Sequence, residues 1–179
     1  MLVAPPGWEE PAILLAEELG CSKVTACVAG GETRTDSVRA GLREVPGEAL
    51  VVLVHDAARP LLSDDVVERV LAPLSEGWDG AIPGLPVADT LQRTAADGRI
   101  LETVPRDGLW AVQTPQAFLG HMLRRGYAGA VAATDCAALV EAAGGRVKVV
   151  EGDPRLLKVT TSADLAKIAS WLDLPETST

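Results

Sequence analysis

The stretch LVVLVHDAARP, residues 50–60, decides the fold of this chain. Its first five residues are continuously apolar, which is the pattern of a strand buried on both faces of a sheet. The polar residues His55 and Asp56 follow at once. Because ligands of open parallel sheets bind outside the carboxyl ends of the strands, we expect a binding site at Asp56.

On both sides of this stretch, short apolar runs alternate with helical patterns. Further strands are expected at residues 2–4, 24–28, 147–151 and 157–160, and helices at residues 8–19, 34–43, 63–74, 116–125, 135–143 and 163–172. Such alternation is typical of βαβ units. The predicted fold class is therefore α/β, with a mainly parallel sheet flanked by helices.

The region 86–105 breaks this alternation. Polar and apolar residues alternate from Val87 to Arg93 and again from Arg99 to Val104, with a turn at residues 96–98 between them. This pattern predicts a protruding β-hairpin arm. Since a two-stranded hairpin is marginally stable by itself in water, burial against a second subunit would stabilise the arm. The alternative is a hairpin whose side chains are exposed to solvent.

Length and charge limit the classes of protein. The 179 residues suit a single domain, residues 1–179. The 16 lysine and arginine residues against 25 aspartate and glutamate residues give a net charge of −9, which argues against nucleic-acid and anionic lipid partners. Residues 1–6 lack the features of a signal peptide, and the apolar runs are too short to span a membrane. The expected location is cytoplasmic.

A glycine-rich turn is the first candidate binding site. The sequence AGGETRTDS, residues 29–37, leads into a predicted helix, whose free N–H groups favour an anion. Glycine lets the backbone approach a ligand closely, and Arg34 or Ser37 could add a direct contact. The alternative is an ordinary tight turn followed by a helix cap.

Asp56 is the second candidate, because a charged group at the end of a buried strand needs a partner. The functional partner would be a bound cation or a ligand hydroxyl; the alternative is that Asp56 simply pairs with Arg59 or with a loop amide. His55 is expected to be a half-buried, hydrogen-bonded histidine rather than a catalytic base. Lys158 is either a phosphate ligand or a solvated surface lysine.

Six segments of the sequence, taken together, indicate a protein family more specifically than any one of them does. They are GGETRTDSV (30–38), VLVHDAARP (52–60), PVADT (86–90), RDGLW with QTPQ (106–110 and 113–116), TD (134–135) and LKVT (157–160). In order and spacing, along almost the whole chain, they resemble the 2-C-methyl-D-erythritol 4-phosphate cytidylyltransferase family.

The resemblance implies a Rossmann-like nucleotidyltransferase that is a homodimer through the 86–105 arm. Such an enzyme transfers the cytidylyl group of CTP to 2-C-methyl-D-erythritol 4-phosphate, with Mg²⁺ bridging triphosphate oxygens. The products are 4-diphosphocytidyl-2-C-methyl-D-erythritol, used in isoprenoid precursor synthesis, and pyrophosphate.

Matched residue by residue, the resemblance also implies roles. The CTP contacts would be Gly31, Glu32, Ser37, Asp56, Ala57 and Lys158, with Glu32 where the family often has another residue. The methylerythritol phosphate contacts would be Arg59, Thr90, Arg106, Thr114 and Thr134, of which Thr90 and Arg106 reach across from the partner's arm. Lys158, Asp56 and Arg106 would be catalytic, and Asp56 would also be the metal ligand.

The chain departs from the family pattern at its start. The family begins with a strand, a glycine-rich loop whose Arg and Lys hold the triphosphate, a helix and a further strand, and residues 1–6 align after that unit. We therefore expect an N-terminally truncated domain that is poorly active or inactive as it stands. The alternatives are a non-catalytic dimer that binds a nucleotide or sugar phosphate, and a cytidylyltransferase for a pentitol phosphate. Cys136 replaces a usual acidic residue, which removes one charge.

Overall fold

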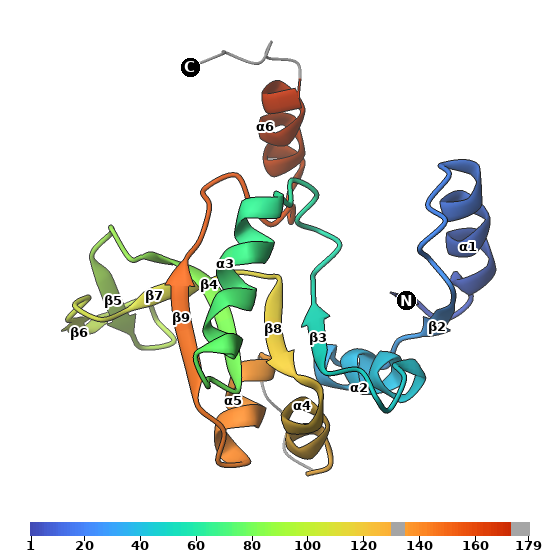
Figure 1. Cartoon of the computed structure of the whole chain (residues 1–179). Coiled ribbons are helices and arrows are strands. Elements are labelled where there is room, and N and C mark those ends of the chain that lie inside the picture. The colour runs from blue at the N-terminus through green and yellow to red at the C-terminus, as the bar shows by residue number, and fades with distance from the viewer. Residues whose placement is uncertain (130–134, 173–179) are drawn as a thin grey trace.

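The computed structural model describes residues 1–129 and 135–172 (Figure 1). The strands in this part of the chain are β1 (Leu2–Ala4), β2 (Cys27–Ala29), β3 (Val51–Val54), β4 (Gly80–Pro86), β5 (Leu91–Thr94), β6 (Ile100–Val104), β7 (Trp110–Val112), β8 (Gln116–Leu119) and β9 (Val147–Glu151). The helices are α1 (Glu9–Glu18), α2 (Arg34–Glu44), α3 (Asp64–Ser75), α4 (Gly120–Tyr127), α5 (Cys136–Ala142) and α6 (Ser162–Leu172). The predicted α/β class is confirmed.

The main sheet has five strands, and β4 lies at its centre. The strand order is β3-β8-β4-β7, and β9 pairs with β4. The β3–β8, β8–β4 and β4–β7 pairings are antiparallel, whereas β4–β9 is parallel. The prediction of a mainly parallel sheet is therefore wrong for this sheet. It assumed a crossover helix between successive strands, but β7 and β8 return to the sheet without one.

Strand β8 is also where the helix predicted over residues 116–125 fails. The segment begins as a strand inserted between β3 and β4, and the helix starts only at Gly120. Phe118 and Ala117 in this strand are fully buried. A Cβ atom on Gly120 would lie 2.1 Å from the carbonyl oxygen of Ala49, so the close passage of the two chain segments requires glycine there.

The two faces of the main sheet are covered by different helices. Successive residues of a strand point to opposite faces. Ile82 and Phe118 accordingly pack in one apolar cluster with residues of α2, α4 and α5, such as Leu123. Their neighbours Ala81 and Ala117 pack in a second cluster with Val70 of α3. The sheet is thus the middle layer of an α/β/α core.

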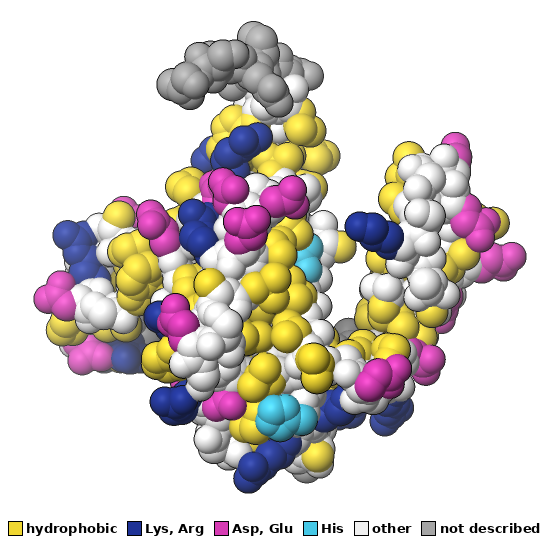
Figure 2. All heavy atoms as spheres, in the orientation of Figure 1, with side chains coloured by type: hydrophobic (Ala, Val, Ile, Leu, Met, Phe, Trp, Pro, Cys, Tyr) yellow, Lys and Arg dark blue, Asp and Glu magenta, His cyan; other side chains and the backbone are white. Residues whose placement is uncertain are grey.

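Strands β1 and β2 form a separate, parallel two-stranded sheet beside α1. Within the described residues no strand pairing joins it to the main sheet. Figure 1 shows α1 and β2 standing to one side, next to α2, and Figure 2 shows the surface hollowed between the part that carries α1 and the main body. Helix α2 therefore links the two sheets.

Strands β5 and β6 form the antiparallel hairpin that the alternation in residues 86–105 predicts. The hairpin protrudes from the main sheet on the side away from α1 (Figure 1). At its tip the Ala95 N–H donates to the carbonyl oxygen of Arg99, and Gly98 has a φ of +85°, a left-handed conformation that suits glycine. No helix in the described part of the chain is long and apolar enough to cross a membrane.

Candidate active site

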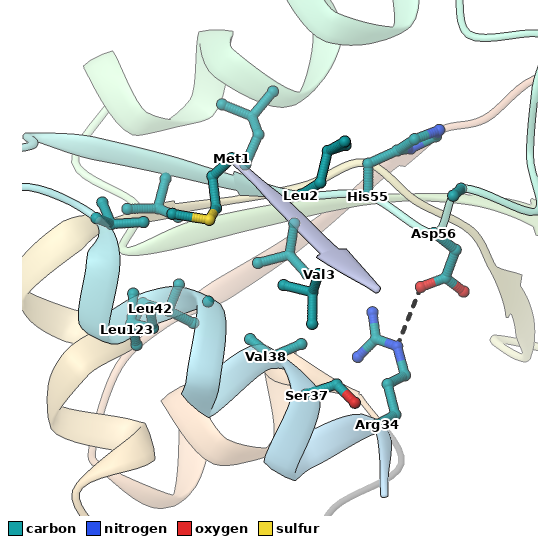
Figure 3. A pocket seen from close by; sticks show the side chains of 16 residues that line it. Met1, Leu2, Val3, Arg34, Ser37, Val38, Leu42, His55, Asp56 and Leu123 are labelled. Carbon is teal, nitrogen blue, oxygen red and sulfur yellow. Dashed lines mark hydrogen bonds and ion pairs between the residues drawn. The ribbon is translucent and has the colours of Figure 1, made fainter. Parts of the chain in front are cut away.

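A cleft of about 350 Å³ lies between β1 and α2 on one side and β3 on the other (Figure 3). Much of its wall is apolar, with side chains such as Val3, Val38 and Leu123. One end is polar, and there Arg34 and Asp56 face each other. The predicted site residues Ser37 and Ala57 also line this cleft.

The glycine-rich turn leads into the first turn of α2 and is closed by its own hydrogen bonds. Thr33 is the N-cap of α2, and its hydroxyl accepts a hydrogen bond from the Asp36 N–H. Ser37 Oγ accepts from the Gly31 N–H at 3.1 Å. A Cβ atom on Gly31 would lie 2.3 Å from Asp36 Cβ, so the tight turn itself requires glycine. The turn and the helix cap are thus both formed, and the binding role of the turn stays a prediction; Glu32 is exposed beside it.

Asp56 is held between two cationic side chains. Its Oδ1 accepts from Arg34 Nε at 3.1 Å, and its Oδ2 accepts from Lys158 Nζ at 2.9 Å. Partial burial opposes ionisation, but the hydrogen bonds and charges of Lys158 and Arg34 outweigh it and lower the pKa of Asp56 below its ordinary value. Lys158 is thus paired within the site rather than solvated alone, and the direct pairing of Asp56 with Arg59 suggested by the sequence is wrong.

Arg34 is the site residue whose contacts sequence reasoning missed. The sequence indicates it only as a possible ligand contact, and nothing in its spacing from Asp56, 22 positions along the chain, indicates a pair. Its Nη1 also donates to Cys136 Sγ at 3.6 Å, and that sulfur lies 3.2 Å from the hydroxyl of Tyr127. Burial raises the pKa of the Cys136 thiol. The side chain that bridges Asp56 and Cys136 therefore comes from a third part of the sequence.

Thr114 connects Asp56 to the rest of the site. Its Oγ1 accepts from the Asp56 N–H at 3.0 Å and lies 3.2 Å from His55 Nδ1. His55 Nε2 lies 3.0 Å from the carbonyl oxygen of Arg59, so this half-buried histidine is hydrogen-bonded on both nitrogens, as expected. Thr114 and His55 thereby fix the loop that follows β3.

Arg59 and Lys158 join that loop to the segment before α6. Arg59 Nη1 donates to the carbonyl oxygen of Leu156, and the Val159 N–H donates to the carbonyl oxygen of Ala58 at 2.8 Å. The Nε atom of Arg59 is buried and has no hydrogen-bond partner within the described residues. The predicted residues Asp56, Arg59, Thr114 and Lys158 are therefore brought together by the fold.

The arm residues are not brought to this cleft. Thr90 and Arg106 are exposed, and Arg106 Nη1 donates to the carbonyl oxygen of Ala88 at the base of the hairpin. Neither residue lines the cleft at Asp56 in the same chain. Thr134, the remaining predicted substrate contact, lies outside the described residues.

The side chains of the cleft fit a magnesium ion only if a bound phosphate group supplies some of its oxygen ligands. In the described residues no group of three or more His, Cys, Asp or Glu side chains could hold a metal ion. Asp56 is the carboxylate of the cleft, and both of its oxygens already face cations. Mg²⁺ commonly binds one or two carboxylates together with waters and substrate phosphates. Asp56 fits that arrangement if Lys158 releases its oxygen.

Solved structures with similar folds define the class of protein. The 2-C-methyl-D-erythritol 4-phosphate cytidylyltransferase of Thermus thermophilus is 35% identical, with a TM-score of 0.78 over 96% of this chain and 81% of that one. The 4-diphosphocytidyl-2C-methyl-D-erythritol synthase of Anaerococcus prevotii is 26% identical, with a TM-score of 0.80 over 97% and 80%. The fold is that of a nucleotidyltransferase.

Sequence comparison specifies the family. The model of the 2-C-methyl-D-erythritol 4-phosphate cytidylyltransferase family matches residues 8–173. The enzyme of that name from Nocardia farcinica is 44% identical over 97% of this chain and 74% of its own length, and the one from Azoarcus sp. is 46% identical over 84% and 64%. The chain belongs to this family. It spans about half to three quarters of the length of such relatives.

Proposed function

We propose that the protein transfers the cytidylyl group of CTP to 2-C-methyl-D-erythritol 4-phosphate in isoprenoid precursor synthesis. The observation that carries this proposal is the polar end of the cleft, where Lys158 and Arg34 hold Asp56 in a chain of this family. The cytoplasmic location stays a prediction from the sequence.

The chemistry needs charge neutralisation more than a covalent intermediate. A phosphate oxygen of the methylerythritol phosphate forms a bond to the α-phosphorus of CTP, and the bond from that phosphorus to the departing pyrophosphate breaks. Negative charge that develops on the phosphoryl oxygens is stabilised by a cation that is already in position. Lys158 is proposed for this role, since its Nζ is held at 2.9 Å from Asp56 beside the cleft.

Binding of the nucleotide is proposed to exchange the ion pairs of Asp56. Lys158 would move from the carboxylate to the α-phosphate, while Arg34 stays on the other oxygen. The oxygen released by Lys158 is the one that would hold Mg²⁺, whose contribution when bound is to neutralise charge on the triphosphate. Asp56 would also lie near the ribose and phosphates.

The nucleoside is proposed to lie against the glycine-rich turn. Gly31, Glu32 and Ser37 are the contacts expected for the cytidine, and Ala57 is expected near the ribose and phosphates. Ser37 and Ala57 line the cleft, which supports this placement. The Gly31 N–H already donates to Ser37, so a base that takes this donor must compete with that hydrogen bond.

The methylerythritol phosphate is proposed to bind between two subunits. Arg59, Thr114 and Thr134 would come from one subunit, and Thr90 and the catalytic Arg106 from the arm of a second copy. Support comes from the arm, where Ile100 is 61% and Leu101 is 51% exposed in the single chain. Exposed apolar side chains on a two-stranded hairpin favour burial against a partner.

We expect the 179-residue chain to turn over poorly. Arg34 and Lys158 both pair with Asp56, so a triphosphate can recruit Lys158 only by breaking an existing ion pair, which costs part of the binding free energy. The same observation favours a second candidate function, which is binding of a nucleotide or sugar phosphate without catalysis. A cytidylyltransferase that acts on a pentitol phosphate is separated from the first candidate only by its substrate preference.

Pyrophosphate release from CTP tests the proposal. We expect weak, CTP-dependent release with methylerythritol phosphate and a lower kcat/KM with ribitol 5-phosphate. Lys158→Met should lower this kcat at least about tenfold, because it removes the proposed transition-state cation. Lys148→Met, which removes a lysine paired with Glu76 on the surface, is the matched control and should leave the rate unchanged.

Strong turnover with methylerythritol phosphate would support the proposed reaction and overturn only the expected low rate. Two other results would contradict the proposal itself. A preference for ribitol phosphate would support the pentitol alternative. CTP binding without pyrophosphate release from any acceptor would favour the non-catalytic candidate.

A further inference from the structure

The guanidinium of Arg34 is held by two hydrogen bonds that lead to different parts of the fold. Its Nε donates to Asp56 Oδ1 at 3.1 Å, and its Nη1 donates to Cys136 Sγ at 3.6 Å. The side chain is 28% exposed and lines the cleft. A guanidinium presents its donors in a rigid plane, so fixing two of them fixes the orientation of the whole group.

Asp56, the residue that Arg34 contacts, is held by three hydrogen bonds. The backbone N–H of Asp56 donates to Thr114 Oγ1, and its two carboxylate oxygens accept from Arg34 and Lys158. Thr114 sets the position of the backbone, whereas Arg34 sets the rotation of the carboxylate. Without Arg34, the carboxylate could turn either oxygen toward Lys158.

The anchors of Arg34 come from elements that are far apart in the sequence. Arg34 is the first residue of α2, Asp56 follows β3, and Cys136 is the first residue of α5. Cys136 is fully buried and also contacts the hydroxyl of Tyr127. Arg34 therefore ties the Asp56 loop to the packed core, which is a more rigid support than a solvated side chain would give.

We propose that Arg34 is a positioning residue that acts through Asp56 and orients the carboxylate toward Lys158 beside the polar end of the cleft. This inference rests on the proposed function, since it names the residue that prepares Asp56 for the nucleotide. Arg34 then contributes to the rate without contacting the reacting phosphates. The alternative is a direct contact between Arg34 and CTP.

A double-mutant cycle separates the two roles. Arg34→Met, Asp56→Asn and the double variant are compared for kcat and KM in pyrophosphate release and for the Kd of CTP by calorimetry. If Arg34 acts through Asp56, each single variant should lower kcat by about tenfold or more, and the double variant should match Asp56→Asn within about twofold. The CTP dissociation constants should follow the same non-additive pattern. The KM for methylerythritol phosphate should change less than about twofold in Arg34→Met.

Two further variants distinguish positioning from loss of structure. Arg34→Lys keeps a cation near Asp56 but lacks the planar fork, so it should recover part of the kcat lost in Arg34→Met. Arg43→Met removes an exposed arginine from the last turn of the same helix and should match the wild-type chain in kcat and Kd.

The outcomes are distinguishable. If the losses of kcat and of CTP affinity in the two single variants add in the double variant, Arg34 contacts the nucleotide itself. That result would overturn the positioning role. An unchanged kcat and Kd in Arg34→Met would overturn it as well. A wild-type chain that binds no CTP would instead overturn the proposed function on which the inference rests.

Discussion

The main sheet and the small β1–β2 sheet are built from similar residues but are packed very differently. In the main sheet, Phe118 is fully buried between β3 and β4, and helices cover both faces. Around β1 and β2, helix α1 buries only Ala16, and Leu14 is 56% exposed. Hydrophobic stabilisation scales with the apolar area removed from water, so stability should reside mainly in the main sheet.

The largest expected difference between the two regions is in the loss of stability when one apolar residue of each is truncated. Phe118→Ala should lower the free energy of unfolding by about 3 to 5 kcal/mol, because it leaves a cavity in the core. Leu14→Ala on α1 should change it by no more than about 0.5 kcal/mol, since the side chain is largely in water already. Chemical denaturation measures both. Equal losses would show that α1 is packed as tightly as the sheet.

Alanine substitutions at two glycines should give a smaller difference in stability. Gly120→Ala should destabilise the protein by about 1 to 3 kcal/mol, because the added Cβ would lie 2.1 Å from the carbonyl oxygen of Ala49 and the backbone must shift. Gly47→Ala, in the loop before β3, meets no atom within 4 Å and should be neutral or stabilising by up to about 1 kcal/mol. Melting temperatures of the two variants test this order, and a reversed order would contradict it.

The smallest expected effect lies at α6, where Asp164 can be tested by pH. Hydrogen bonds from the N–H and hydroxyl groups of Thr160 and Thr161 lower the pKa of Asp164 to about 2. Because this value lies below the unfolded-state pKa of about 3.9, the stabilisation is fully present above that pH and is lost as the pH falls toward 2.

Asp164→Asn should therefore destabilise α6 slightly near neutral pH, and the difference from the wild-type chain should shrink below about pH 4. Helicity followed by circular dichroism in an acid titration measures it. A difference that grows in acid would contradict the assigned hydrogen bonds.

Local patterns in the sequence predict several elements well. The apolar run at residues 50–54 is strand Val51–Val54, and Thr33 caps α2 with its hydroxyl. Asp164 accepts from the Thr161 N–H and donates its own N–H to the Thr161 hydroxyl, which is the reciprocal pattern of a capping box. Each of these features depends on residues only a few positions apart, so the sequence contains the whole interaction.

The errors arise where partners are distant. A short apolar run such as residues 117–119 has no period that separates a strand from the start of a helix. It becomes a strand because β3 and β4 offer open edges on both sides. The same limit applies to Arg34, whose ion pair with Asp56 spans 22 positions.

The sequence by itself determines the α/β class, the arm, the helix caps and the motifs that indicate a cytidylyltransferase. Their causes are local propensity, turn chemistry and residue identity. Only the tertiary structure decides the antiparallel pairing of the main sheet and the convergence of Arg34, Asp56, Thr114 and Lys158 at one cleft. Strand partners and ion pairs between distant segments depend on how the whole core packs.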